Sequence, residues 1–126
     1  MSNTTTPSKT RTITLTDRPP VTIREDQWPI IATGDWGDSP NGIRSQSNRE
    51  ATVRVREHED GRRIVYGVSS SQWQGESGAK AGMLIAAVDG KPDTDATIRA
   101  IHDVTDTIGH PALSAECIAD LPAEAI

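Results

Sequence analysis

The most regular pattern in the chain is an alternation of polar and apolar residues that runs through positions 51–56 and returns through 63–68. Such alternation is typical of strands that bury one face and expose the other. Asp60-Gly61 lies between the two segments and favours a two-residue type I′ turn, whose central positions need positive φ. The pattern therefore predicts an antiparallel hairpin in which Val55 faces Tyr66, with the apolar side chains on one face.

Three shorter segments predict further strands. Residues 11–16 alternate in the same way, residues 21–23 add an extended stretch after a pair of prolines, and residues 83–88 form a short apolar run. An apolar run of this length favours a buried strand over a helix. The polar, glycine-rich segments 34–48 and 69–82 show no periodicity, so we expect loops there.

Apolar residues recur at helical spacing over residues 93–109, which begin with aspartates suited to cap a helix and end with a glycine. A last helix is expected over 111–121, where a proline stands at the start and another follows the end. Residues 25–33 predict a short helix that opens with two acidic residues and buries Trp28.

These elements predict one α+β domain. A small antiparallel sheet of three or four strands would be covered on one face by the helices around Trp28, Ile101 and Cys117. Residues 1–10 are rich in serine and threonine and have little to bury, so we expect a disordered tail there. The domain itself would then span residues 11–126.

Composition narrows the class of protein. The 126 residues include no phenylalanine, one tyrosine and three tryptophans, so the core has to be built mainly from aliphatic side chains. The single cysteine leaves no intrachain disulfide framework and no cysteine-rich zinc site. No apolar run approaches the ~20 residues that span a bilayer, and the first residues lack the apolar core of a secretory signal. We therefore expect a cytoplasmic protein without a membrane partner.

Charge is distributed unevenly over a chain whose formal net charge is -5. Residues 1–84 carry 11 basic and 10 acidic side chains, whereas residues 85–126 carry 2 basic and 8 acidic ones. The net negative charge argues against direct binding to nucleic acid. The acidic C-terminal third either keeps the protein soluble or attracts a basic partner, such as a protein that itself binds nucleic acid.

No motif points to catalysis. The region around Ser77 departs from a nucleophile elbow because position 79 is alanine, and residues 78–82 lack the final residues of a phosphate-binding loop. His58 stands among carboxylates, but neighbouring strand residues point to opposite faces, which favours a solvated turn over a metal site. We therefore expect no enzyme activity, no metal and no cofactor. An enzyme of unrecognised type that uses His58 or Glu76 is the weaker alternative.

Arg54 and Arg56 share one face of the predicted hairpin and form the strongest basic patch. Such a face can bind single-stranded nucleic acid when an aromatic side chain accompanies it. The predicted register places Tyr66 on the opposite face, which favours a solvated outer surface. A small nucleic-acid-associated accessory protein that uses the Arg54/Arg56 face is therefore another alternative.

Two tryptophans in polar segments are the best candidates for a binding surface. Trp36 and Trp73 lie among glycines and polar residues rather than on a periodic apolar face, and tryptophan is enriched at binding hot spots. The alternative is that each covers a thin core. The candidate partner-binding residues are Trp36, Trp73, Gln74, Glu76, and the acidic helix residues Asp95, Asp103 and Asp106.

Several segments resemble a family of short proteins found in proteobacterial genomes and in their phages and plasmids. The resemblance rests on Leu15–Val21 (LTDRPPV), Trp28–Ala32 (WPIIA), Val53–Gly67 (VRVREHEDGRRIVYG), Trp73–Glu76 (WQGE) and Glu116–Glu124 (ECIADLPAE). It covers most of the chain beyond residue 11. The family has no established activity, so the resemblance implies a setting rather than a mechanism and transfers no site residues.

That setting shapes the leading hypothesis. Small acidic proteins of mobile elements that lack enzyme motifs are often inhibitors of host defence, such as anti-CRISPR or antirestriction proteins. We therefore expect a non-catalytic protein-binding module that inhibits a host defence system. Its partner would be a host protein, for example a nucleic-acid-binding defence complex, and the sequence sets no oligomeric state.

Overall fold

The computed structural model describes residues 9–38, 49–71 and 78–123. This part of the chain forms strands, two α-helices and one 3-10 turn. In chain order the elements are β1 (Thr10–Ile13), β2 (Val21–Arg24), the 3-10 turn η1 (Glu25–Gln27), β3 (Ile30–Asp38), β4 (Arg49–Glu57), β5 (Arg63–Ser71), β6 (Ala79–Ile85), α1 (Thr94–Thr107) and α2 (Leu113–Ala119).

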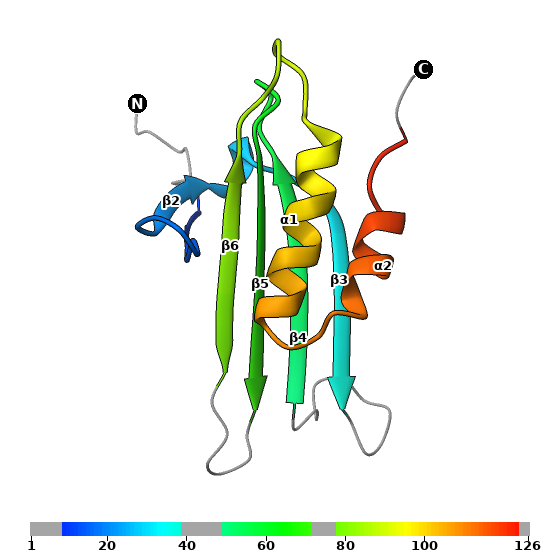
Figure 1. The fold of residues 1–126 in the computed structure, drawn as a ribbon. Helices are drawn as coiled ribbons and strands as arrows, with labels where there is room; N and C mark the ends of the chain where they lie inside the picture. Colours follow the sequence, from blue (N-terminus) through cyan, green and yellow to red (C-terminus); the bar gives the residue numbers. More distant parts are fainter. Residues whose placement is uncertain (1–8, 39–48, 72–77, 124–126) are drawn as a thin grey trace, which may run out of the picture.

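Strands β3, β4, β5 and β6 form a four-stranded antiparallel sheet in that order, and β1 and β2 form a separate two-stranded hairpin. Figure 1 shows both helices on one face of the large sheet, with α1 packed on β5 and β6 and α2 on β3. This arrangement confirms the predicted α+β class and its sheet covered by helices on one face. Within the described ranges, no helix is both long and apolar enough to cross a membrane.

The main core lies between the sheet and the two helices. Val53 and Val55 of β4 are fully buried there against Ile101 and Val104 of α1. Burial of each aliphatic side chain of this kind stabilises the fold by about 1.5–3 kcal/mol. Gly67 allows α1 to come this close to the sheet, because a Cβ atom at that position would lie 2.8 Å from Val104 Cγ1.

A second, smaller apolar cluster lies on the opposite face of the sheet, under the hairpin. Ile13 of β1 and Trp28 pack there against Ile64 of β5. Beyond β1 the chain runs along the edge strand β6, where Thr16 N donates a hydrogen bond of 2.8 Å to Gly82 O. These contacts anchor the hairpin over β5 and β6.

The helix predicted over 93–109 is confirmed as α1. Asp93 Oδ1 accepts a hydrogen bond of 3.1 Å from Ala96 N and so caps the first turn, and Gly109 follows the helix with a φ of 83°. The predicted last helix is present but shorter, because residues 111 and 112 form a turn before α2 begins. Cys117 is buried on α2 as predicted.

The short helix predicted over 25–33 is wrong. The 3-10 turn η1 forms in its place, and Ile30 already begins β3. Pro29 ends helical hydrogen bonding, and two isoleucines at positions 30 and 31 favour a strand once β4 is present as a partner. Trp28 is buried as predicted, but it belongs to the cluster under the hairpin, on the face opposite the helices.

The loop predicted over 34–48 begins as strand, because β3 continues to Asp38. Gly34 explains why the sequence pattern does not reveal this strand: it stands at a core position without contributing a side chain. A Cβ atom there would lie 3.0 Å from Val53 Cγ1 and 3.1 Å from Leu113 O of α2. Glycine therefore allows α2 to pack directly on the strand backbone. In the same way, the predicted loop 69–82 contributes strand residues to β5 and β6.

The turn between β4 and β5 also differs from the prediction. Gly61 N and Arg62 O hydrogen bond to His58 O and His58 N, each at 2.9 Å, and Gly61 has a φ of 95°. This is a three-residue loop that ends in a glycine bulge rather than a type I′ turn. The register shifts by one residue, so that Tyr66 pairs with Arg54 and not with Val55. The predicted separation of Tyr66 from the arginines is therefore wrong.

Candidate functional site

Trp36 lies near the end of β3 and pairs with Ala51 of β4, which places it on the helix-covered side of the sheet. It remains 38% exposed there. Its ring lies against the ring of His110, with 4.8 Å between the ring centroids and an interplanar angle of 38°. Trp36 is thus neither a buried core residue nor a loop side chain, but a strand residue with a defined aromatic neighbour.

The backbone on both sides of this aromatic pair is held in place. His110 lies between α1 and α2, where its N–H donates to Thr105 O at 2.9 Å and its carbonyl accepts from Leu113 N at 3.0 Å. Asp120 Oδ2 at the end of α2 accepts a hydrogen bond of 2.9 Å from Thr33 N of β3. The pair is therefore fixed by both the sheet and the connection between the helices.

β3 is an edge strand of the described sheet, since β4 is its partner on one side and α2 flanks it. Figure 1 shows that β3 and β5 end, and β4 and β6 begin, at the same end of the sheet. Trp36 lies two residues before the end of β3. The candidates Trp73, Gln74 and Glu76 follow β5 in the chain and lie outside the described residues.

The three acidic candidates on α1 do not lie together. Asp103 and Asp106 are exposed in the C-terminal half of the helix, and Asp106 O accepts a hydrogen bond from Gly109 N in the turn that leads to His110. Asp95 lies in the first turn, about 16 Å from Asp106 along the helix axis at 1.5 Å per residue. The structure therefore places Asp106 near the tryptophan end and separates Asp95 from it.

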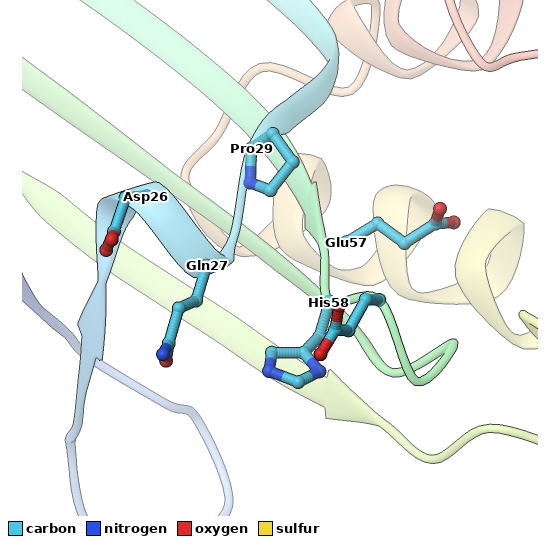
Figure 2. Close-up of a pocket in the computed structure, with 6 residues that line it drawn as sticks. Asp26, Gln27, Pro29, Glu57 and His58 are labelled. Carbon is cyan, nitrogen blue, oxygen red and sulfur yellow. The ribbon is translucent and has the colours of Figure 1, made fainter.

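A pocket of about 490 Å³ lies at the hairpin end of β4, where the sequence places His58. Figure 2 shows Glu57 pointing away from Asp26, so the carboxylates do not converge on one point. His58 Nδ1 lies 3.1 Å from Asp60 Oδ1, and the His58 ring packs at a tilt of 52° against Trp28, with 5.0 Å between the ring centroids. These contacts hold the His58 side chain in place at the turn.

Charged groups around this pocket already form hydrogen bonds and ion pairs with neighbouring side chains. Glu57 Oε1 accepts a hydrogen bond of 2.8 Å from Arg63 Nε, and the Arg63 side chain is almost fully buried. The backbone N–H and the guanidinium of Arg62 both donate to the Asp60 carboxylate and lower its pKa. Among the described residues, no group of three or more histidine, cysteine or acidic side chains is placed to hold a metal ion.

Cys117 is unsuited to nucleophilic chemistry. It is fully buried in the main core, and burial raises the pKa of its thiol to about 12. A thiol is a nucleophile as the thiolate. Cys117 therefore remains protonated at neutral pH and acts as a small apolar core residue.

The Arg54/Arg56 face does not form the solvated surface that the sequence favours. Arg54 Nη1 donates to Asp35 Oδ1 of β3 at 2.8 Å. Arg56 is 5% exposed, and it donates to Tyr66 Oη at 2.8 Å and to Trp28 O at 2.9 Å. Arg56 is therefore a structural residue that fastens the segment after β2 to the sheet.

The comparisons do not supply a function. No protein-family model matches the chain, and no curated protein or solved structure matches it.

Sequence reasoning found Trp36 but not its partner His110. The contact joins a strand that the pattern did not predict to a turn between two helices, so no local spacing connects them. It also missed the role of Glu25, whose carboxylate lies 2.8 Å from Arg11 Nε and 3.5 Å from Arg56 Nη2. Segments 11–16 and 21–23 were predicted as separate strands, and the pairing of β1 with β2 that brings these groups together appears only in the structure.

Proposed function

We propose that the chain is a non-catalytic protein-binding module that presents Trp36 to its partner. The observation that carries this proposal is that Trp36 is 38% exposed while its ring is seated on His110. A large aromatic side chain that is already held in one orientation loses little conformational entropy when a partner covers it. Exposed tryptophans of this kind are typical of binding hot spots.

The surroundings favour a partner with a basic surface. Asp103 and Asp106 are exposed on α1, and Glu116 and Asp120 are exposed on α2, which packs on the strand that carries Trp36. Opposite charges across an interface speed association and orient the two proteins. The acidic side chains of α1 and α2 would attract a basic partner, and Trp36 would supply the apolar contact.

A host defence protein fits this partner chemistry. Proteins that act on nucleic acids present basic surfaces to the phosphate backbone. The resemblance to proteins of phages and plasmids supplies the setting in which blocking such a surface is useful. We therefore propose that the module inhibits a host defence system, in the manner of anti-CRISPR proteins, by occupying a basic surface of one of its components.

The test compares three proteins immobilised on a resin and exposed to host-cell lysate, with and without nuclease treatment. Trp36→Ala removes the proposed contact. Ile30→Ala is the matched control, because Ile30 is 45% exposed at the other end of the same strand. The captured protein is identified by mass spectrometry, purified and titrated against each variant.

We expect the wild type and Ile30→Ala to bind the same protein with similar affinity. Trp36→Ala should bind it about thirtyfold more weakly, the effect of losing a contact of about 2 kcal/mol. Equal affinity of all three proteins would exclude Trp36 as the contact. Loss of every captured protein after nuclease treatment would indicate nucleic acid as the bridge and contradict direct protein binding.

Inhibition of defence is tested separately, by phage plating on cells that carry an active defence system. Expression of the wild type should raise plating efficiency, and expression of Trp36→Ala should not. A protein that binds its partner through Trp36 but leaves plating unchanged would retain the binding proposal and exclude the inhibitory one.

A further inference from the structure

A cleft of about 260 Å³ lies between β1 and the face of the large sheet that is opposite the helices. We call it the basic trough and define it by five of its lining residues. These are Arg11 and Thr12 of β1, Tyr66 and Val68 of β5, and Lys80 of β6. It lies on the other side of the sheet from Trp36 and is independent of the protein-binding surface proposed above.

The strand register brings the floor of the trough together. Lys80 pairs directly with Val68 across β5 and β6, so their side chains are neighbours on one face. Tyr66 precedes Val68 by two residues and therefore points to the same face. The hairpin above them adds Arg11 and Thr12 as a wall.

The trough has an excess of positive charge. Lys80 is exposed, and no carboxylate of the described residues forms an ion pair with it. Arg11 Nε lies 2.8 Å from Glu25 Oε1, and Arg56 Nη2 lies 3.5 Å from the same oxygen. The single negative charge of Glu25 is therefore shared between two positively charged guanidinium groups.

Other carboxylates on this face do not cancel that excess. Asp35 is paired with Arg54 at 2.8 Å, which neutralises both. Glu50 is on the same face of β4, but it is two strands and two residues away from Lys80 in the sheet register, which is about 12 Å from the strand spacing and rise. The local balance is therefore positive, although the whole chain carries a formal net charge of -5.

The aromatic ring in the trough is held in place. Tyr66 Oη accepts a hydrogen bond of 2.8 Å from Arg56 Nε, and the Arg56 guanidinium lies 5.9 Å from the centre of the ring. The methyl groups of Val68 extend the apolar surface beside it. A fixed aromatic ring beside an excess of positive charge is the combination that receives a nucleobase and its phosphate. The volume is close to the lower end of small-molecule sites, about 300 Å³.

We infer that the basic trough binds a single nucleotide unit, with its phosphate at Lys80 and Arg11 and its base against Tyr66 and Val68. A free nucleotide and one unit of a single strand share this chemistry. One stacking surface and two cations make a modest site, so the dissociation constant falls in the range of about 10⁻⁴–10⁻⁶ M at physiological salt.

The test is an NMR titration of the ¹⁵N-labelled full chain with four probes: adenosine 5′-monophosphate, a hexathymidylate single strand, adenosine and inorganic phosphate. Amide shifts are followed at Thr12, Val68 and Lys80, and those of α1 and α2 serve as the internal reference. Lys80→Glu tests the cation. Lys91→Glu is the matched control, because Lys91 is an exposed lysine in the turn between β6 and α1.

We expect the nucleotide to shift the trough amides and leave those of the helices in place. Lys80→Glu should weaken binding at least tenfold, and Lys91→Glu less than twofold. A hexathymidylate that binds tenfold tighter than the nucleotide assigns the site to single strands, and equal or weaker binding assigns it to free nucleotides.

Three results would overturn the inference. The first is the absence of trough shifts with both the nucleotide and the single strand. The second is an inorganic phosphate affinity equal to that of the nucleotide, because the base would then contribute nothing and the site would be one for small anions. The third is equal weakening by Lys80→Glu and Lys91→Glu, which would indicate attraction by net charge rather than a site.

Discussion

Arg56 Nε donates a hydrogen bond of 2.8 Å to Tyr66 Oη across β4 and β5. The contact exists because the hairpin register places Arg56 opposite Ile64 and Arg54 opposite Tyr66, so that all four side chains share one face. Arg56 also donates to Trp28 O at 2.9 Å. A nearly buried guanidinium thus joins the sheet to the segment that follows the N-terminal hairpin.

Loss of the Tyr66 hydroxyl should destabilise the fold. Tyr66→Phe removes the acceptor of Arg56 Nε while the ring remains, and an unsatisfied buried donor of this kind costs about 1–3 kcal/mol. Thr12→Val is the control, because it removes an exposed hydroxyl contact of 3.0 Å to Thr22. Urea denaturation measures both. An equal free energy of unfolding for the two variants would contradict the role of Arg56.

Stability should fall at acid pH through Glu25. The hydrogen bond from Arg11 lowers the pKa of Glu25 below its usual value of 4.5. A carboxyl group with a lowered folded-state pKa stabilises the fold above its unfolded pKa, and that stabilisation is lost as the pH falls through the folded value. We therefore expect the free energy of unfolding to decline below about pH 4.5, the usual value.

Glu25→Gln should flatten this decline, because the variant has no carboxyl group to protonate at that position. Glu59→Gln, at an exposed residue of the hairpin turn, is the matched control and should keep the wild-type profile. Denaturation midpoints between pH 3 and pH 7 are the measurement. Parallel profiles for the wild type and Glu25→Gln would show that Glu25 contributes nothing to acid stability.

The two described tryptophans should separate stability from binding. Trp28 is 7% exposed, so Trp28→Ala should cost about 3–5 kcal/mol. Trp36 is 38% exposed, and Trp36→Ala should cost about 1 kcal/mol, chiefly through the lost contact with His110. Chemical denaturation of both variants measures the two losses in unfolding free energy. If Trp36→Ala is as unstable as Trp28→Ala, Trp36 is a core residue rather than a binding residue.

Two glycines with positive φ should respond differently to alanine. Gly61 and Gly90 have φ values of 95° and 74°, so each substitution carries the backbone cost of about 1–2 kcal/mol. A Cβ atom at Gly61 would also lie 3.0 Å from Gly90 O and 3.1 Å from Ala87 Cβ, whereas Gly90 has open space around it. The melting temperature of Gly61→Ala should therefore be clearly lower than that of Gly90→Ala. Coincident melting curves would mean that the turn is not packed against residues 87–91.

Cys117 should be protected from thiol reagents until the protein unfolds. Burial raises the pKa of its thiol to about 12 from a usual value of 9.0. Since the folded value is the higher one, stability should be lost as the pH rises above the unfolded value. Iodoacetamide labelling at pH 8 should be slow in the native protein and fast in urea. Rapid native labelling would place Cys117 at the surface.

The fold class could be predicted because it depends on local patterns. Alternation over 51–56 and 63–68 defines two strands wherever they pack, and the capped periodic segment over 93–109 defines α1 by itself. The errors over 25–33 and 34–48 share one cause: β3 crosses the boundary between the two segments, its glycines at 34 and 37 interrupt any alternation, and pairing with β4 decides its conformation. Long-range pairing overrides weak local preference.

The candidate sites also combine features set by the local sequence with features set by tertiary contacts. The sequence by itself determined that Trp36 is unusual, that Cys117 is a core residue and that the C-terminal third is acidic. Tertiary structure alone decided the ring contact between Trp36 and His110, and a single extra residue in the hairpin loop decided which face carries Tyr66. Because strand side chains alternate with a period of two, a shift of one residue moves a side chain to the other face, and no local composition reports that choice.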